Sequence, residues 1–317
     1  MSKPRLLTRP APRLRARSAG FTLVEAILVI VITGILAAVV AVFIVKPVQG
    51  YFDSVRRAEL SDAADNALRR IARDARGALP NSLRQPDDGT GSRCFEFLPV
   101  AGGGRYVTDK NSPTDDILDF VAADTSADVA GYSSAGDAAP VVGQSLVIYN
   151  LGLPDASAYN DPTQANSTRG LVAAGGTVSA ATGSGNLKFS AKRFPFESPG
   201  RRFQLLAAGA GGTSHSVIYA CIGAGLSGGQ GQGGIYRYTR ALPAAATLAP
   251  LASCPASVPA GAQQLVGEVA SCSFDYTAVP ATAATFQRFG LLEMRLTLTR
   301  ENESVRLYHE AHVHNVP

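Results

Sequence analysis

Apolar residues form one long, almost uninterrupted run near the N-terminus and shorter, periodic runs over the rest of the chain. The long run, residues 21–45, has only three polar positions, Thr22, Glu25 and Thr33. As a helix it would be roughly 37 Å long, at about 1.5 Å per residue, and a hydrocarbon core is about 30 Å thick. The pattern therefore predicts a transmembrane helix over residues 21–45.

The apolar pattern changes after Pro47, where apolar residues recur every three or four positions, as is typical of an amphipathic helix. Pro47 is expected to kink the helix, because its ring removes a backbone donor and collides with the preceding turn. Gly77 and Pro80 supply a stop signal. We predict one spine helix from Phe21 to Arg76, half in lipid and half against a soluble domain. The periodic apolar positions are Val48, Tyr51, Phe52, Val55, Leu60, Ala64, Ala67, Leu68, Ile71 and Ala75.

Short apolar runs bounded by Gly, Pro, Asn and Asp follow the helix and predict β-strands. Between them, the Ala-, Gly- and Ser-rich stretches 122–140 and 170–186 are interpreted as long loops. The glycine-rich stretch 223–234 is interpreted as a flexible connection between two strands. The predicted strands cover residues 94–98, 117–121, 145–149, 203–207, 216–222, 235–240 and 266–276.

The clearest alternation lies at the C-terminal end. Every second residue from Leu292 to Leu298 is apolar, and polar residues separate them, so one face of this strand packs and the other is polar. After a turn near residues 301–304, Val305, Leu307, Ala311 and Val313 continue an apolar face. We expect this antiparallel sheet to rest on the amphipathic half of the spine.

The predicted fold class is therefore α+β, with a long N-terminal helical spine packed on an antiparallel β-sheet domain. The expected segments are a basic leader (1–20), a transmembrane half-spine (21–45), an amphipathic half-spine (46–79) and a β-rich globular domain (80–317).

Positive charge is concentrated before Gly20. The chain has 29 Lys+Arg and 25 Asp+Glu, a net charge of +4. Without residues 1–20 the balance becomes 23 − 25 = −2, so the basic character gives no indication of nucleic-acid binding. By the positive-inside rule the leader stays cytoplasmic and residues beyond Lys46 lie across the membrane. The six basic residues of the leader are Lys3, Arg5, Arg9, Arg13, Arg15 and Arg17.

All four cysteines, Cys94, Cys221, Cys254 and Cys272, follow the predicted span. An even number in an oxidising compartment suggests two disulfides, although four cysteines allow three connectivities. Closeness in sequence weakly favours Cys254 with Cys272, which leaves Cys94 with Cys221. A zinc site needs tighter ligand spacing, and none is present.

Three sequence patterns resemble sites of chemistry, and each has a simpler structural interpretation. The sequence around Ser227, from Gly225 to Gly229, matches G-x-S-x-G, but a nucleophile elbow is followed by a helix, whereas more glycine follows here. Two clusters of acidic or histidine side chains, given at the end of this paragraph, could ligate a metal ion. Residues of these types are also common at strand ends and in turns, which accounts for both clusters without a metal. We expect no enzyme, no cofactor and no metal. The two groups are Glu310 with His312 and His314, and Asp115 with Asp116 and Asp119.

The start of the apolar run is unlike that of a secretory signal, whose apolar region is about 7–15 residues long and ends at its cleavage site. Here the small residues come first, ending at Gly20, and Glu25 lies inside the apolar run. A carboxylate in that position costs about 2.5–3.5 kcal/mol on insertion scales, so we expect a partner or function to offset it.

The sequence Gly-Phe-Thr-Leu-Val-Glu at residues 20–25 resembles the processing site of type IV pilins. The resemblance implies that a prepilin peptidase cuts after Gly20 and methylates the new amino group of Phe21. It also implies that Glu25 faces the amino terminus of a neighbouring subunit in a filament. The implied partners are the peptidase, other pilin and minor pilin subunits, and the inner-membrane assembly machinery.

Short stretches over the whole chain are also similar to minor pilins of the MshO type, from mannose-sensitive-haemagglutinin (MSHA) pili. This similarity implies a subunit that helps to start the filament, anchored in the inner membrane with a periplasmic domain before assembly. A J-type pseudopilin of type II secretion and a PilW-like minor pilin stay open, as does an adhesin that uses Tyr236 and Tyr238. The stretches are residues 48–53, 78–84, 94–100, 288–300 and 312–317.

Overall fold

The computed structural model describes residues 20–86, 92–110, 112–277 and 289–317. The chain divides into two compact units, Met1–Ser54 and Val55–Pro317, which are considered separately. The basic leader predicted over residues 1–20 lies outside the described residues except for Gly20.

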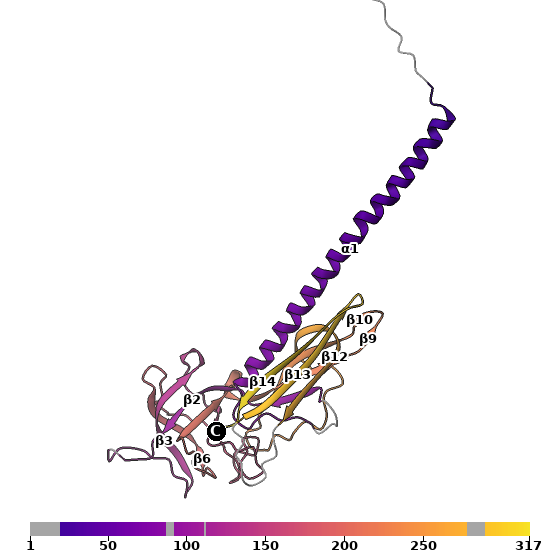
Figure 1. Ribbon diagram of the computed structural model, residues 1–317. Coiled ribbons are helices and arrows are strands. Elements are labelled where there is room, and N and C mark those ends of the chain that lie inside the picture. Colours follow the sequence, from indigo (N-terminus) through magenta and orange to yellow (C-terminus); the bar gives the residue numbers. More distant parts are fainter. Residues whose placement is uncertain (1–19, 87–91, 111, 278–288) are drawn as a thin grey trace, which may run out of the picture. The chain divides into compact units, whose positions relative to one another are not determined.

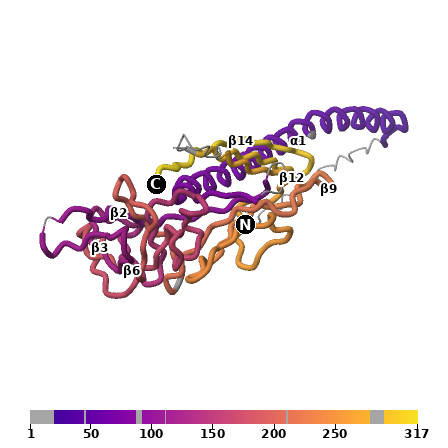
Figure 2. The backbone as a smooth tube through the Cα atoms, turned by 90° about the horizontal axis from the view of Figure 1, so that it is seen from below, coloured from indigo at the N-terminus to yellow at the C-terminus, as the bar shows by residue number. Residues whose placement is uncertain are grey.

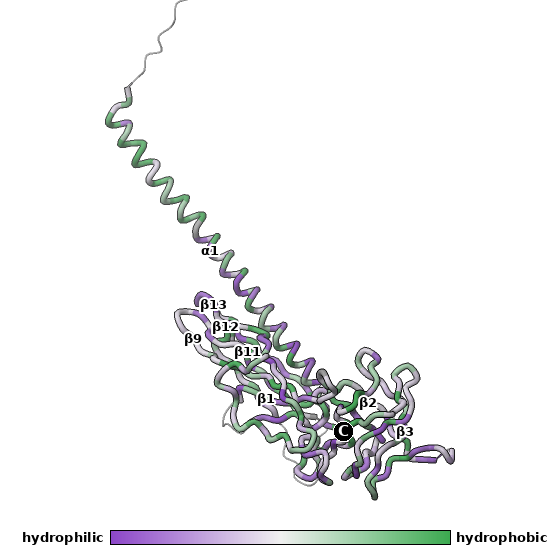
Figure 3. The backbone as a smooth tube through the Cα atoms, turned by 180° about the vertical axis from the view of Figure 1, so that it is seen from behind, coloured by the Kyte–Doolittle hydropathy of each residue, from purple (hydrophilic) through white to green (hydrophobic). Residues whose placement is uncertain are grey.

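A long helix, α1, spans Leu23–Arg76 (Figure 1). It confirms the predicted spine and its stop, because the helix ends one residue before Gly77, whose N–H donates to Arg73 O and Asp74 O. The helix runs through Pro47, and the predicted kink there stays a prediction. Among the described residues of the N-terminal unit, the large apolar side chains given an exposure are exposed, from Phe21 to Phe52, and Figure 3 shows this part of α1 as almost continuously hydrophobic.

The second unit contains a six-stranded antiparallel sheet, here called the first sheet, with strand order β1-β8-β11-β12-β13-β14. The glycine-rich connection between β8 and β11 forms a small hairpin of β9 (Leu226–Ser227) and β10 (Gln230–Gly231). The strands of the first sheet are β1 (Cys94–Phe97), β8 (His215–Ile222), β11 (Gly233–Ala241), β12 (Gln263–Thr277), β13 (Phe289–Arg300) and β14 (Glu303–His314).

The C-terminal part of α1 packs on one face of the first sheet, as the alternating pattern predicts. Leu60, Leu68 and Ile71 of the helix share a buried core with the apolar positions of β13, from Leu292 to Leu298. At roughly 25 cal/mol per Å² of apolar surface, such burial supplies most of the energy that holds a helix on a sheet. The prediction that the C-terminal hairpin packs against the amphipathic half of the spine helix is therefore confirmed.

A second six-stranded antiparallel sheet, with order β5-β4-β7-β2-β3-β6, was not predicted as a sheet. It lies beside the first sheet (Figure 2). Its own core includes Tyr132, Phe189 and Phe203. Its strands are β2 (Val100–Tyr106), β3 (Asp124–Ser134), β4 (Ser145–Val147), β5 (Arg169–Leu171), β6 (Ser184–Lys192) and β7 (Arg202–Leu206), with short 3₁₀ turns at Ala135–Asp137 and Ala210–Gly212.

Two sequence interpretations in this region are wrong. Residues 122–140 were expected to be a loop but contain β3, whose sequence is rich in Ala, Ser and Asp. Residues 117–121 were expected to be a strand but lie outside any strand, and the Asp119 carboxylate there accepts hydrogen bonds from the N–H groups of Val121 and Ala122. Such local side-chain bonds compete with strand pairing.

The expected disulfide pairing is also wrong. Cys94 lies directly opposite Ala220 in the β1–β8 ladder, so its side chain is on the same face as Ala220. Neighbouring residues of a strand point to opposite faces, so Cys221 is on the other face and cannot reach Cys94. Instead Cys94 bonds to Cys254 with Cα atoms 5.5 Å apart, and Cys221 bonds to Cys272 with Cα atoms 6.5 Å apart.

Candidate functional site

The Gly20–Phe21 peptide bond lies just outside the helix. α1 begins at Leu23 and is capped by Thr22, whose Oγ1 accepts the Glu25 N–H at 3.2 Å. Thr22 and Glu25 have the spacing of a capping box, which fixes where a helix starts. Because of this cap, Gly20 and Phe21 precede the helix, and the Phe21 side chain is 74% exposed. The bond is therefore accessible to an enzyme without unwinding the helix.

The space around Gly20 does not require a glycine. A Cβ atom added there would meet no atom within 4 Å among the described residues, and its φ is not in the left-handed region. The described chain would therefore tolerate a larger residue at position 20. The described residues therefore give no structural reason for glycine at this position.

Glu25 occupies the first turn of α1, where the partial positive charge of a helix N-terminus favours a carboxylate. Within the described residues, no hydrogen bond or ion pair is made by its carboxylate group. A helix terminus offsets only about 0.3–1 kcal/mol at exposed sites, less than the insertion cost of about 2.5–3.5 kcal/mol. The remaining stabilisation has to come from outside the described part of the chain.

The helix that follows has the length and composition of a membrane span. It is one candidate span among the described residues, and none of its most apolar window is buried by the protein. Gly20, Phe21 and Glu25 thus lie at the start of a helix whose most apolar window is covered by none of the described residues.

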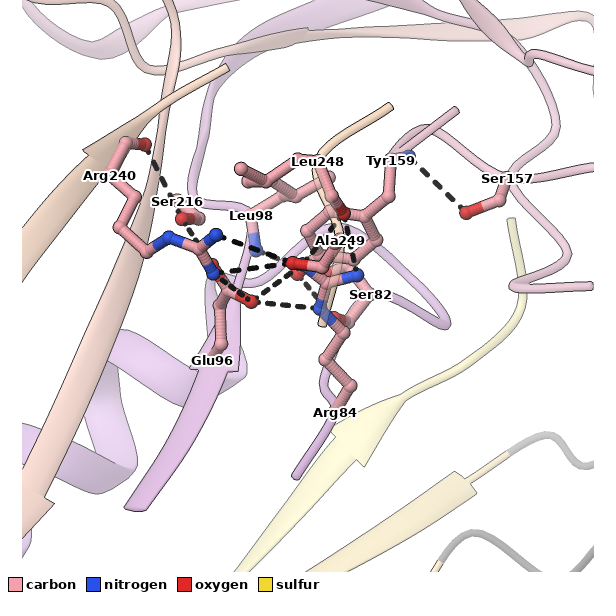
Figure 4. A network of polar contacts seen from close by, with 10 residues as sticks. All are labelled: Ser82, Arg84, Glu96, Leu98, Ser157, Tyr159, Ser216, Arg240, Leu248 and Ala249. Carbon is pink, nitrogen blue, oxygen red and sulfur yellow. Dashed lines mark hydrogen bonds and ion pairs between the residues drawn. The ribbon is translucent and has the colours of Figure 1, made fainter. Parts of the chain in front are cut away.

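A buried polar network in the second unit joins one carboxylate to two guanidinium groups (Figure 4). Glu96, whose side chain is 1% exposed, accepts Arg84 Nε at 2.8 Å and Ser216 Oγ at 2.6 Å, and pairs with Arg240 Nη1 at 3.3 Å. Arg84 and Arg240 also donate to the carbonyls of Leu248 and Ala249. The network ties β1, β8 and β11 to the segment that follows β11.

Tyr159, from the segment between β4 and β5 of the second sheet, packs against this network. The Arg84 guanidinium lies 3.5 Å from the centre of the Tyr159 ring, and the Tyr159 hydroxyl donates to Ser82 O at 2.8 Å. Complete burial raises the pKa of Tyr159 well above its usual value. Every charged group here has a partner from the protein, so the cluster has the character of a structural core and not of a substrate site.

The patterns weighed as sites of chemistry take structural roles. Ser227 lies in the β9–β10 hairpin, paired with Gln230, without the helix that a nucleophile elbow needs. The acids near residue 116 accept hydrogen bonds from the protein itself: Asp115 from the Ser112 N–H, Asp119 from the Val121 N–H, and Asp116 from the Asn186 side-chain amide. No group of three or more His, Cys, Asp or Glu side chains is arranged to hold a metal in the described parts of the chain.

The tyrosine pair that the adhesin alternative would use, together with the glycine-rich loops, is not an exposed row. Tyr236 and Tyr238 are half-buried and pack with Leu251 and Cys254 against the outer face of β8. The segment that covers them is held by the Cys94–Cys254 disulfide. Sequence alternation could not show this, because the covering segment follows β11 and has no regular pattern of its own.

The comparisons with known proteins bear on the N-terminal segment alone. Residues 15–41 match the family described as the prokaryotic N-terminal methylation motif. No curated protein and no solved structure matches the chain. The matched segment includes Gly20, Phe21 and Glu25, and the fold is a long apolar helix packed on antiparallel sheet. The motif and the fold together indicate a type IV pilin-like or pseudopilin subunit.

Proposed function

We propose that this protein is a minor subunit of a type IV pilus of the MSHA type. A prepilin peptidase cuts it after Gly20 and methylates the amino group of Phe21, and the mature chain then enters a filament. The observation that carries the proposal is the position of the Gly20–Phe21 bond, exposed and immediately before the Thr22 cap, at the start of an apolar helix.

Glu25 has a specific role in this proposal. Its carboxylate pairs with the amino group of Phe21 in a neighbouring subunit, which offsets the cost of placing a charge in lipid. A buried ion pair is tolerated when both members are hydrogen-bonded and close. This role explains why the carboxylate has no partner within the described chain.

The role of Glu25 is tested by substitution. Glu25→Ala is expected to leave cleavage after Gly20 unchanged but to reduce incorporation into pili at least tenfold, measured by immunoblot of sheared filaments. Glu25→Asp, which keeps the charge, is the matched control and is expected to retain more incorporation than Glu25→Ala. Normal incorporation of Glu25→Ala would contradict the proposed role.

The assignment to an MSHA-type pilus, rather than to a J-type pseudopilin or a PilW-like minor pilin, rests on the scattered stretches such as residues 48–53 and 312–317. Deletion of the gene separates these possibilities. Loss of MSHA-type filaments with normal protein secretion supports the proposal, whereas loss of secretion with normal filaments supports the pseudopilin.

A further inference from the structure

The two disulfides of the second unit lie on opposite faces of the first sheet. Cys94 and Cys254 pack with Ala220 on the face directed away from α1. Cys221 and Cys272 belong to the core that is shared with α1. The first sheet therefore separates the two pairs of sulfur atoms, and each cysteine has its partner on its own side.

Further contacts hold Cys254 and Cys272 on their separate faces. The buried guanidinium groups of Figure 4 bind the carbonyls of residues 248–249, shortly before Cys254. Cys272 is opposite Leu296 in the β12–β13 ladder, and Leu296 is buried in the core shared with α1. A bond between Cys254 and Cys272 would pull one of them away from its face, so it is incompatible with the folded chain.

Four cysteines allow three pairings, and the observed pairing alone keeps each bond on a single face. A bond between Cys94 and Cys221 would join neighbouring strands through opposite faces. A bond between Cys94 and Cys272 would also join opposite faces. A chain with either wrong pairing therefore cannot complete the first sheet.

Loop length favours wrong bonds in the unfolded chain. Cys254 and Cys272 are 272 − 254 = 18 residues apart, whereas the native pairs are separated by 160 and 51 residues. Since the probability of closing a loop falls as the 3/2 power of its length, Cys272 meets Cys254 roughly fivefold more often than it meets Cys221. By the same rule Cys254 meets Cys272 roughly 25-fold more often than it meets Cys94. The bond that forms first is therefore most often a wrong one.

We propose that this protein needs a thiol–disulfide isomerase to reach its native pairing. The partner is defined by its chemistry, as a protein that presents a reactive thiolate to the incompletely folded chain. It must act before the first sheet is complete, because Cys94 and Cys221 are 0% and 3% exposed in the folded chain. The inference rests on the fold and the disulfide pairing, and it does not depend on whether the protein enters a filament.

The exchange needs no net oxidant or reductant once the wrong bonds Cys254–Cys272 and Cys94–Cys221 are present. The isomerase thiolate attacks the Cys272 sulfur and releases the Cys254 thiolate. This thiolate attacks Cys94, which forms the first native bond and releases the Cys221 thiolate. Cys221 then attacks Cys272, forms the second native bond and expels the isomerase thiolate. Two protein disulfides exist before and after the exchange, and the isomerase is regenerated.

The first bond is identified in the full chain, reduced and denatured in guanidinium chloride. Oxidised glutathione forms the bonds and is itself reduced to two thiols. Free cysteines are alkylated after short times, and the chain is cut after Glu268, which lies between Cys254 and Cys272. Mass spectrometry is expected to find Cys254–Cys272 roughly fivefold more abundant than Cys221–Cys272. Equal amounts, or an excess of Cys221–Cys272, would overturn the proposal.

The need for an isomerase is measured by refolding the reduced full chain in detergent. Oxidised and reduced glutathione are present, with or without purified protein disulfide isomerase. The isomerase is expected to raise the rate at which both native bonds appear by about fivefold or more. An unchanged rate would overturn the proposal, as would an equal gain from an isomerase whose active-site cysteines are replaced by serine.

A variant with one possible bond is the matched control. In the Cys94→Ser, Cys254→Ser chain, Cys221 and Cys272 have no wrong partner, so the isomerase should change the rate of their bond by less than about twofold. A gain as large as in the wild-type chain would mean that the isomerase does not act on wrong pairings, and would contradict the proposal. All readouts are disulfide maps of the protein itself, so they can fail or succeed independently of leader cleavage and filament assembly.

Discussion

Tyr219, on β8 of the first sheet, donates its hydroxyl to Asp74 Oδ2 of α1 at 2.6 Å. The Tyr219 ring is completely buried, while Arg237 Nε lies 3.4 Å from the same carboxylate oxygen at the sheet surface. The bond therefore joins the buried interior of the sheet to the polar side of the helix. It fixes the last turns of α1 more specifically than apolar packing alone.

Removing this bond should destabilise the domain. Tyr219→Phe leaves the Asp74 carboxylate with fewer donors and is expected to lower the free energy of unfolding by about 1–2 kcal/mol, a typical loss for a hydrogen bond to a charged group. The measurement is denaturant unfolding of the full chain in detergent. Tyr238→Phe on β11, where no described hydrogen bond involves the hydroxyl, is the control and should change stability little. Equal losses in both variants would contradict this role.

The buried carboxylate of Glu96 should be the most sensitive polar position in the fold. Glu96→Gln removes the countercharge shared by Arg84 and Arg240, and breaking one partner of a buried ion pair costs about 3 kcal/mol. Thermal unfolding should show a large drop in Tm. The control is Glu293→Gln, whose ion pair with Arg295 is half-exposed and is worth about 1 kcal/mol or less. A Glu96→Gln chain as stable as this control would contradict the structural role of the network.

Lys192 should give the domain an unusual rise in stability at alkaline pH. Its side chain is 4% exposed and its Nζ donates to Gln164 O, and burial lowers the pKa of Lys192 from 10.5 to about 8. Between pH 8 and 10.5 the unfolded chain therefore binds more protons than the folded chain. By linkage, the free energy of unfolding rises with pH in this window, by at most about 1.4 kcal/mol per pH unit.

The comparison is made between pH 8 and 9.5, because above pH 10 buried tyrosines act in the opposite direction. Burial raises the pKa of Tyr159 and Tyr219, so unfolded tyrosines lose protons first and stability falls. Lys192→Met should abolish the rise, and Lys188→Met, an exposed position on the same strand, should retain it. Identical pH slopes for the wild-type and Lys192→Met chains would rule out this effect.

Features with a local cause could be predicted from the sequence. The stop of α1 follows from Gly77, and the packed face of β13 follows from the alternation between Leu292 and Leu298. The Gly20–Phe21–Glu25 site was recognised for the same reason, since its pattern is contiguous. All residues of the candidate site lie within the contiguous stretch 20–25.

Features that depend on distant contacts could not be predicted. Three consecutive glycines make β2 look like a loop, yet a Cβ at Gly103 would lie 2.6 Å from Phe203 O, and one at Gly102 would lie 2.8 Å from Ser133 O. Glycine is needed there because neighbouring strands approach closely. In the sequence, Glu96 looks like a surface residue of a strand, because its partners Arg84 and Arg240 come close to it only in the folded chain. The disulfide pairing likewise depends on the β1–β8 register.

Mass spectrometry of the N-terminus of the native protein tests the central claim most directly. Protein isolated from membranes or filaments is expected to begin at Phe21 with one methyl group on its amino nitrogen, and a Gly20→Val chain is expected to keep its leader. Because the described residues leave room for a side chain at position 20, that variant should still fold, as unfolding measurements can check. A native protein that begins at Met1, or at any residue other than Phe21, would contradict the account.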